Sequence, residues 1–186
     1  MRDSESSDVT SINAVRRWLE TVVIAQEFCP FAQREFERGS IAYEASQATS
    51  IAGALEDLGD CLSALENDIE IETLLLIFDQ GFDDFEQYLD LYFAAEELLA
   101  SLGFESVYQI ASFHPEYQFA DAPADDPANF TNRSPHPVLH LLRESSVSRA
   151  VDQHPDINAI PKDNIERARE LGHETLASAL ARCYDV

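Results

Sequence analysis

The chain has 186 residues, 45 % hydrophobic and 25 % charged, a composition that fits one globular domain spanning residues 1–186. Twelve basic residues stand against thirty-five acidic ones, so the formal net charge is −23. A field of this sign repels phosphate backbones and anionic lipid headgroups, which argues against nucleic acid and membrane surfaces as partners.

The compartment is inferred from what the sequence lacks. No apolar run approaches the roughly 18 residues that span a bilayer. The start "MRDSESSDVTS" lacks both the basic and the apolar region of a signal peptide. The cysteines, Cys29, Cys61 and Cys183, show no metal-type spacing. We therefore expect a cytoplasmic protein with reduced thiols.

Hydrophobic periodicity predicts helices, and short apolar runs predict strands. Residues 1–9 are polar and are expected to be disordered. The expected helices cover 11–28, 30–38, 50–66, 83–102 and 134–151, with a final helical segment over 161–183 that breaks near Gly172. The expected strands cover 40–45, 73–78 and 106–113.

Strands that alternate with helices of this length are most simply parallel. The order therefore predicts an α/β fold, a small three-layer-like domain with a short, mostly parallel sheet covered by helices. The alternative is a ferredoxin-like α+β plait, which requires a fourth strand.

The segment after the third strand carries an unusual set of side chains. Residues 111–144 hold three of the five histidines and two arginines. Connections longer than about 12–15 residues are usually functional or disordered. Aromatic residues give this one apolar anchors, so we expect an ordered loop that forms a ligand or active site.

His114 follows the third strand directly. Ligands of open α/β sheets bind beyond the carboxyl ends of the strands, so His114 is the predicted general acid or base. The alternative is a hydrogen-bonded loop histidine without a catalytic role.

Asn132, Arg133 and Ser134 are the predicted substrate-binding corner. Ser134 is a good N-cap and Pro135 a good first-turn residue, and the start of a helix favours an anion. Arg133 can hold a carboxylate or phosphate through two parallel hydrogen bonds. Alternatively, Arg133 pins the loop by pairing with Asp125 or Asp126.

The predicted helix over 134–151 places His136, His140 and Arg143 on one face. His140 and Arg143 are therefore further candidates for binding a substrate. Two histidines four residues apart also suit a metal ion, but no third ligand is placed by spacing, so we assign no metal site.

Cys29 precedes Pro30 at the start of a predicted helix. A cysteine in this position can have a lowered pKa and act as a nucleophile, and a Cys29–His114 pair is one possible arrangement. The alternative is a buried, unreactive thiol.

The strings "CPFA", "TLLLIF", "ASFHPEYQFA", "NRSPHPVLHLLRE" and "IPKDNIERARELG" resemble the uncharacterised bacterial family of domain of unknown function 1415. The likeness runs from Trp18 to Gly172. It departs at His136, where the family pattern has Tyr, and this weakens a metal site at that position. The resemblance implies a bacterial protein of one domain and transfers no activity.

Three hypotheses follow for the function. The first is an enzyme that acts on a small anionic metabolite through His114, Cys29 and the arginine corner. The second is a non-catalytic module that binds a small ligand or a partner at the same loop. The third is a metal-binding protein. The sequence specifies neither a cofactor nor an oligomeric state.

Overall fold

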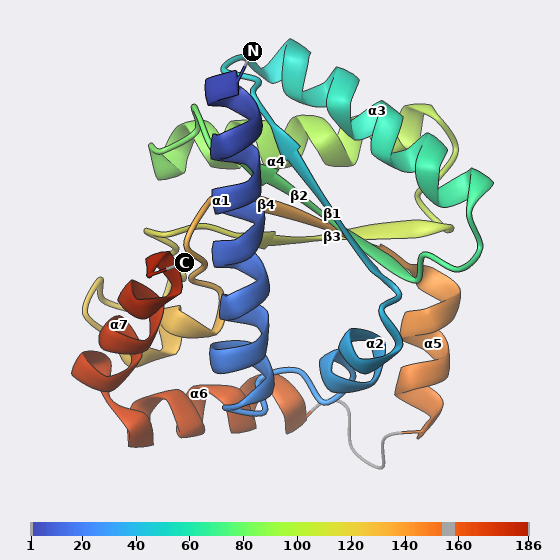
Figure 1. Cartoon of the computed structure of the whole chain (residues 1–186). Helices are drawn as coiled ribbons and strands as arrows, with labels where there is room; N and C mark the ends of the chain where they lie inside the picture. Colours follow the sequence, from blue (N-terminus) through green and yellow to red (C-terminus); the bar gives the residue numbers. More distant parts are fainter. Residues whose placement is uncertain (1, 154–158, 186) are drawn as a thin grey trace.

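The computed structural model describes residues 2–153 and 159–185 (Figure 1). Its helices are α1 (Arg2–Trp18), α2 (Ala32–Arg38), α3 (Ile51–Asn67), α4 (Phe85–Ser101), α5 (Glu144–Gln153), α6 (Ile160–Leu171) and α7 (His173–Ala181). A π-helix (Leu19–Ile24) continues α1, and short 3-10 turns cover Pro127–Thr131 and Arg182–Tyr184. The strands are β1 (Ile41–Ser46), β2 (Thr73–Phe78), β3 (Tyr108–Phe113) and β4 (Val138–Arg143). Helix α1 thus begins at Arg2, within the segment that we predicted to be disordered.

The four strands form one sheet in the order β1-β2-β4-β3. Strand β1 runs parallel to β2, whereas β4 is antiparallel to both of its neighbours, β2 and β3. The predicted α/β fold with helices over the sheet is confirmed, but the prediction of a mostly parallel sheet is wrong. The fourth strand of the plait alternative exists, although the element order βαβαββ differs from the βαββαβ of a ferredoxin-like plait.

Strand β4 lies where a helix was predicted. Pro137 disfavours helical backbone at His136, so a helix that starts at Pro135 is interrupted within its first turn. The side chains of β4 then alternate, with Leu139 and Leu141 in one core and Val138 in the other. Pairing with β2 and β3 satisfies the backbone groups of the inserted strand on both sides.

Two cores lie on the two faces of the sheet. Helices α3 and α4 pack on one face against Leu74 and Leu76. On the other face, Leu75 and Ile77 share a core with buried side chains of α1, α6 and α7 (Figure 1). All six residues of β2 are buried, since this strand has neighbours on both sides and helices on both faces.

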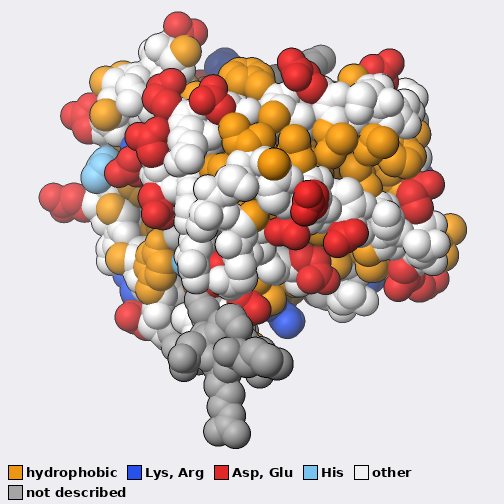
Figure 2. All heavy atoms as spheres, turned by 90° about the horizontal axis from the view of Figure 1, so that it is seen from above, with side chains coloured by type: hydrophobic (Ala, Val, Ile, Leu, Met, Phe, Trp, Pro, Cys, Tyr) orange, Lys and Arg blue, Asp and Glu red, His pale blue; other side chains and the backbone are white. Residues whose placement is uncertain are grey.

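The surface reflects the acidic composition. Figure 2, which views the molecule from above, shows acidic side chains spread over that face, apolar side chains between them and few basic ones. Among the described residues, no helix has the length and apolar character needed to cross a membrane.

Candidate functional site

The structure places His114 inside the core. The side chain is fully buried, its Nδ1 accepts from the N–H of Glu116 at 3.0 Å, and its Nε2 therefore donates to the carbonyl of Phe82 at 2.9 Å. Burial lowers the pKa of His114 and outweighs the hydrogen bond to Phe82, which raises it. Both ring nitrogens thus hold neighbouring backbone, including Phe82 with its φ of 58°.

Arg133 ties the loop to itself. Its Nε donates to the carbonyl of Tyr117 at 3.1 Å and its Nη2 to that of Ala124 at 3.0 Å, while the guanidinium lies 4.7 Å from the ring centroid of Phe130. These contacts match the alternative role, in which Arg133 pins the loop, but its partners are backbone carbonyls rather than the carboxylate of Asp125 or Asp126. Asp126, which we considered as a partner, binds Arg169 at 2.7 Å instead.

The predicted helix start at Ser134 is absent, so the predicted anion-binding corner lacks the helix end on which it was based. The chain has no regular structure there and bends at Pro135 and His136, and the Oγ of the buried Ser134 donates to the carbonyl of His136. Asn132 donates through Nδ2 to the carbonyl of Ser112 at 3.2 Å and so joins the end of the loop to β3.

The histidine pair that suggested a metal is also separated. The ring of His136 packs on Tyr184 with centroids 5.7 Å apart, whereas His140 lies within β4 and bonds Thr73. Among the described residues, no group of three His, Cys, Asp or Glu side chains is placed to hold a metal ion.

Cys29 lies in a strained turn between the π-helix and α2. π-Helical turns and left-handed non-glycine residues are both costly, and they are often found at functional sites. Here the π-helix Leu19–Ile24 is followed within three residues by Glu27, whose φ is 56°. Cys29 is half-buried and forms no disulfide.

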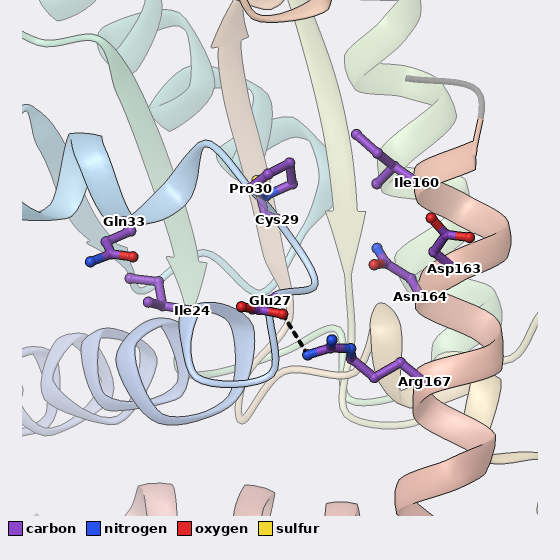
Figure 3. Close-up of a pocket in the computed structure, with 9 residues that line it drawn as sticks. All are labelled: Ile24, Glu27, Cys29, Pro30, Gln33, Ile160, Asp163, Asn164 and Arg167. Carbon is purple, nitrogen blue, oxygen red and sulfur yellow. Dashed lines mark ion pairs between the residues drawn. The ribbon is translucent and has the colours of Figure 1, made fainter. Parts of the chain in front are cut away.

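Helix α6 holds this turn from the opposite side (Figure 3). Arg167 pairs with the carboxylate of Glu27 at 2.8 Å and donates to the carbonyl of Gln26 at 3.0 Å. Asn164 donates to the carbonyl of Phe28 at 2.6 Å. The backbone on the N-terminal side of Cys29 is therefore fixed by two side chains from a helix more than 130 residues away in sequence.

Three cavities meet at Cys29. The first, of 390 Å³, lies between the turn and α6 and is drawn in Figure 3. The second, which we call the arginine cavity, measures 310 Å³ and lies between α2, α5 and the sheet. The third, which we call the loop cavity, measures 320 Å³ and is lined by Val23, Phe28, Cys29, Phe113, Phe119, Thr131, Asn132, Ile160, Pro161, Asn164 and Ile165.

The arginine cavity concentrates positive charge in an acidic molecule. Four of the eleven arginines line it, Arg34, Arg38, Arg143 and Arg149, together with two glutamates, Glu35 and Glu72. It also contains Cys29, Thr73 and His140, and its apolar wall consists of Leu19, Phe31, Ile41, Leu75, Leu142 and Val147. The lining thus has two formal positive charges in excess, in a chain of net charge −23.

The glutamates orient the arginines without enclosing them. Arg38 pairs with Glu35 at 3.3 Å and Arg149 with Glu72 at 3.0 Å. The arginine side chains are 50 % and 62 % exposed, whereas the glutamates are 17 % and 18 % exposed. The guanidinium groups of Arg38 and Arg149 therefore have N–H donors that face solvent. Arg143 differs, because its guanidinium already donates to the carbonyls of Leu65, Ile71 and Asp68 and to the hydroxyl of Tyr108.

His140 presents a neutral imidazole to the arginine cavity. The hydroxyl of Thr73 donates to the carbonyl of Leu141 at 2.6 Å, so the contact of 2.6 Å between Thr73 and Nε2 of His140 has the ring as donor. Burial lowers the pKa of His140 to about 4. The ring is therefore uncharged at neutral pH, with the lone pair on Nδ1.

The thiol of Cys29 is protonated at neutral pH. Burial raises its pKa, and the opposing hydrogen bonds from the backbone of Phe31 and Ala32 only reduce the effect. Both ring nitrogens of His114 bond backbone groups, those of Phe82 and Glu116, rather than the thiol of Cys29. The predicted activation by His114 has no counterpart in these contacts.

Of the predicted site residues, Cys29, His140 and Arg143 line the arginine cavity, and Asn132 lines the loop cavity beside Cys29. His114, Arg133 and Ser134 line none of the cavities described above. The arginine cavity lies where β1 and β2 begin and β4 ends, which is the opposite edge from the one predicted. Arg34, Arg38 and Arg149 were missed, since they lie on helices α2 and α5 and only the fold brings these helices together.

The fold and these cavities define an α/β protein with a mixed sheet and an arginine-lined cavity next to a half-buried thiol. Residues 10–178 match the model of the family described as protein of unknown function (DUF1415), and the chain belongs to this family. No curated protein and no solved structure matches the chain.

Proposed function

We propose that the protein binds a small organic anion in the arginine cavity. One observation carries this proposal: four of the eleven arginines surround a single cavity of 310 Å³, although the chain as a whole is strongly acidic. A guanidinium matches the geometry of a carboxylate or phosphate, and Arg38 and Arg149 keep donors that face solvent.

Neutral His140 and the apolar wall favour an organic ligand over an inorganic ion. An imidazole with a pKa of about 4 adds no charge at neutral pH, but it offers the lone pair of Nδ1 to a hydroxyl or amide group. Leu75, Leu142 and Val147 provide contacts for a hydrocarbon body. Most ligand pockets combine apolar walls with a few polar groups in this way.

Calorimetric titration with hexanoate, hexyl phosphate and inorganic phosphate tests the proposal. We expect hexanoate or hexyl phosphate to bind, and Arg149→Gln to weaken binding about tenfold, the lower end for a hydrogen bond to a charged group. Arg182→Gln is the matched control, since it changes the net charge by the same amount as Arg149→Gln. Arg182 is exposed, lies just after α7, and does not line the arginine cavity. Equal weakening by both variants, or no binding by the wild type, contradicts the proposal.

A thiol-dependent enzyme is the second candidate, because Cys29 lies where the three cavities meet. Alkylation of Cys29 by iodoacetamide distinguishes a thiol-dependent enzyme from a binding protein. Its rate is measured as a function of pH with saturating hexanoate. A nucleophile activated by its ligand reacts at a rate that is independent of pH down to neutrality. A rate that falls tenfold per pH unit below pH 9 identifies an ordinary thiol and leaves binding as the function.

A further inference from the structure

The loop cavity and the arginine cavity are neighbours. Cys29 lines both of them. His140, in the wall of the arginine cavity, and Phe113, in the wall of the loop cavity, have ring centroids 6.2 Å apart. Cys29 is thus common to both linings, and the two walls also approach each other at this pair of rings.

The loop cavity differs in character from its neighbour. None of its lining residues is charged, in a chain of which 25 % is charged. Phe28, Phe113, Phe119 and Ile165 supply apolar surface. The amide nitrogens of its two asparagines already donate to backbone carbonyls, Asn132 to Ser112 and Asn164 to Phe28. The lining offers an anion no positively charged partner, whereas a hydrocarbon group loses water-exposed surface there.

We infer that the two cavities hold the two ends of one amphiphilic ligand, an alkyl carboxylate. The carboxylate lies between Arg38 and Arg149, and the alkyl chain passes Cys29 into the loop cavity. This inference rests on the proposed function, because it assigns the headgroup to the arginine cavity. It adds the class of the ligand and a role for the loop after β3, whose residue Phe119 forms part of the wall.

The inference is tested with hexanoate, octanoate and decanoate titrated into the full-length protein. Each methylene group that enters the loop cavity is expected to tighten binding about fourfold. Ile165→Phe fills the loop cavity and is expected to abolish this gain while leaving the affinity for hexanoate within twofold. Ile24→Phe is the matched control, because Ile24 lines the cavity drawn in Figure 3 and neither of the other two.

Trp18 gives an independent measurement. It is the only tryptophan, and its ring contacts Phe113 edge to face with centroids 5.1 Å apart. Decanoate is therefore expected to change tryptophan fluorescence in the wild type and in Ile24→Phe but not in Ile165→Phe. Circular dichroism of each variant verifies that it is folded.

The outcomes separate the inference from the proposed function. If Arg149→Gln weakens every carboxylate but affinity does not rise with chain length, the anion site stands and the inference is wrong. If affinity rises equally in wild type and Ile165→Phe, the alkyl chain lies elsewhere and the inference is again wrong. If no carboxylate binds, or Arg149→Gln binds all of them like wild type, the proposed function itself fails.

Discussion

The pKa of His140 predicts how the stability of the protein depends on pH. The imidazole titrates at about 4 in the folded protein against an ordinary value of 6.5, because burial disfavours its charged form. The folded protein therefore binds this proton less tightly than the unfolded chain. Its contribution to stability is fully present above pH 6.5 and is lost as the pH falls towards 4. The difference of about 2.5 units corresponds to about 3 kcal/mol, of which about 2–3 kcal/mol is lost by pH 4.5.

Urea unfolding at pH 7.5, 6.5, 5.5 and 4.5 measures this effect in the wild type and in His140→Gln, which cannot titrate. Burial also lowers the pKa values of His114 and His136, but both remain in the variant, so their contributions cancel in the comparison. The free energy of unfolding of wild type is expected to fall by about 2–3 kcal/mol more than that of the variant. His173→Gln, at an exposed position, is the control and is expected to follow the wild type. Parallel curves for the wild type and His140→Gln would show that His140 is not held neutral by burial.

Three further predictions concern stability and thiol access. Leu75→Ala and Leu76→Ala open voids on opposite faces of the central strand. Each is expected to lower the free energy of unfolding, measured in urea, by about 2–5 kcal/mol. A change within error would contradict the central position of β2. In folded protein at neutral pH, a maleimide is expected to label half-buried Cys29 before buried Cys61, and mass spectrometry of the peptides would expose the reverse order. Arg133→Ala removes two hydrogen bonds to loop carbonyls, so it is expected to cost about 1–3 kcal/mol of stability and to leave the affinity for hexanoate unchanged; weaker hexanoate binding by the folded variant would return Arg133 to the ligand site.

The helices and the first three strands were predictable because their signals are local. The apolar stripe of α3 contains Leu58, Leu62 and Leu65 at helical spacing, and all three are buried. The apolar run of β2 indicated a strand covered on both faces, as observed. Strand β4 was mistaken for a helix because Val138–Arg143 carries a pattern that suits either state. Pro137 disfavours the helix start that was predicted, and the ladders offered by β2 and β3 favour the strand.

The sequence by itself also indicated that residues 111–144 are special and that Cys29 and His140 deserve attention, because cysteine and histidine have distinctive chemistry wherever they lie. It could not indicate which of these groups share a cavity. Arg38 and Arg149 are 111 positions apart, and they face the same space only because α2 packs at the start of β1 while α5 follows directly from β4. The roles of His114 and Arg133 were likewise decided by tertiary contacts. Their side-chain N–H groups donate to backbone carbonyls, and the sequence alone does not indicate these partners. Charge and reactivity are properties of single residues, but a binding site depends on distances between residues, and these exist only once the chain has folded.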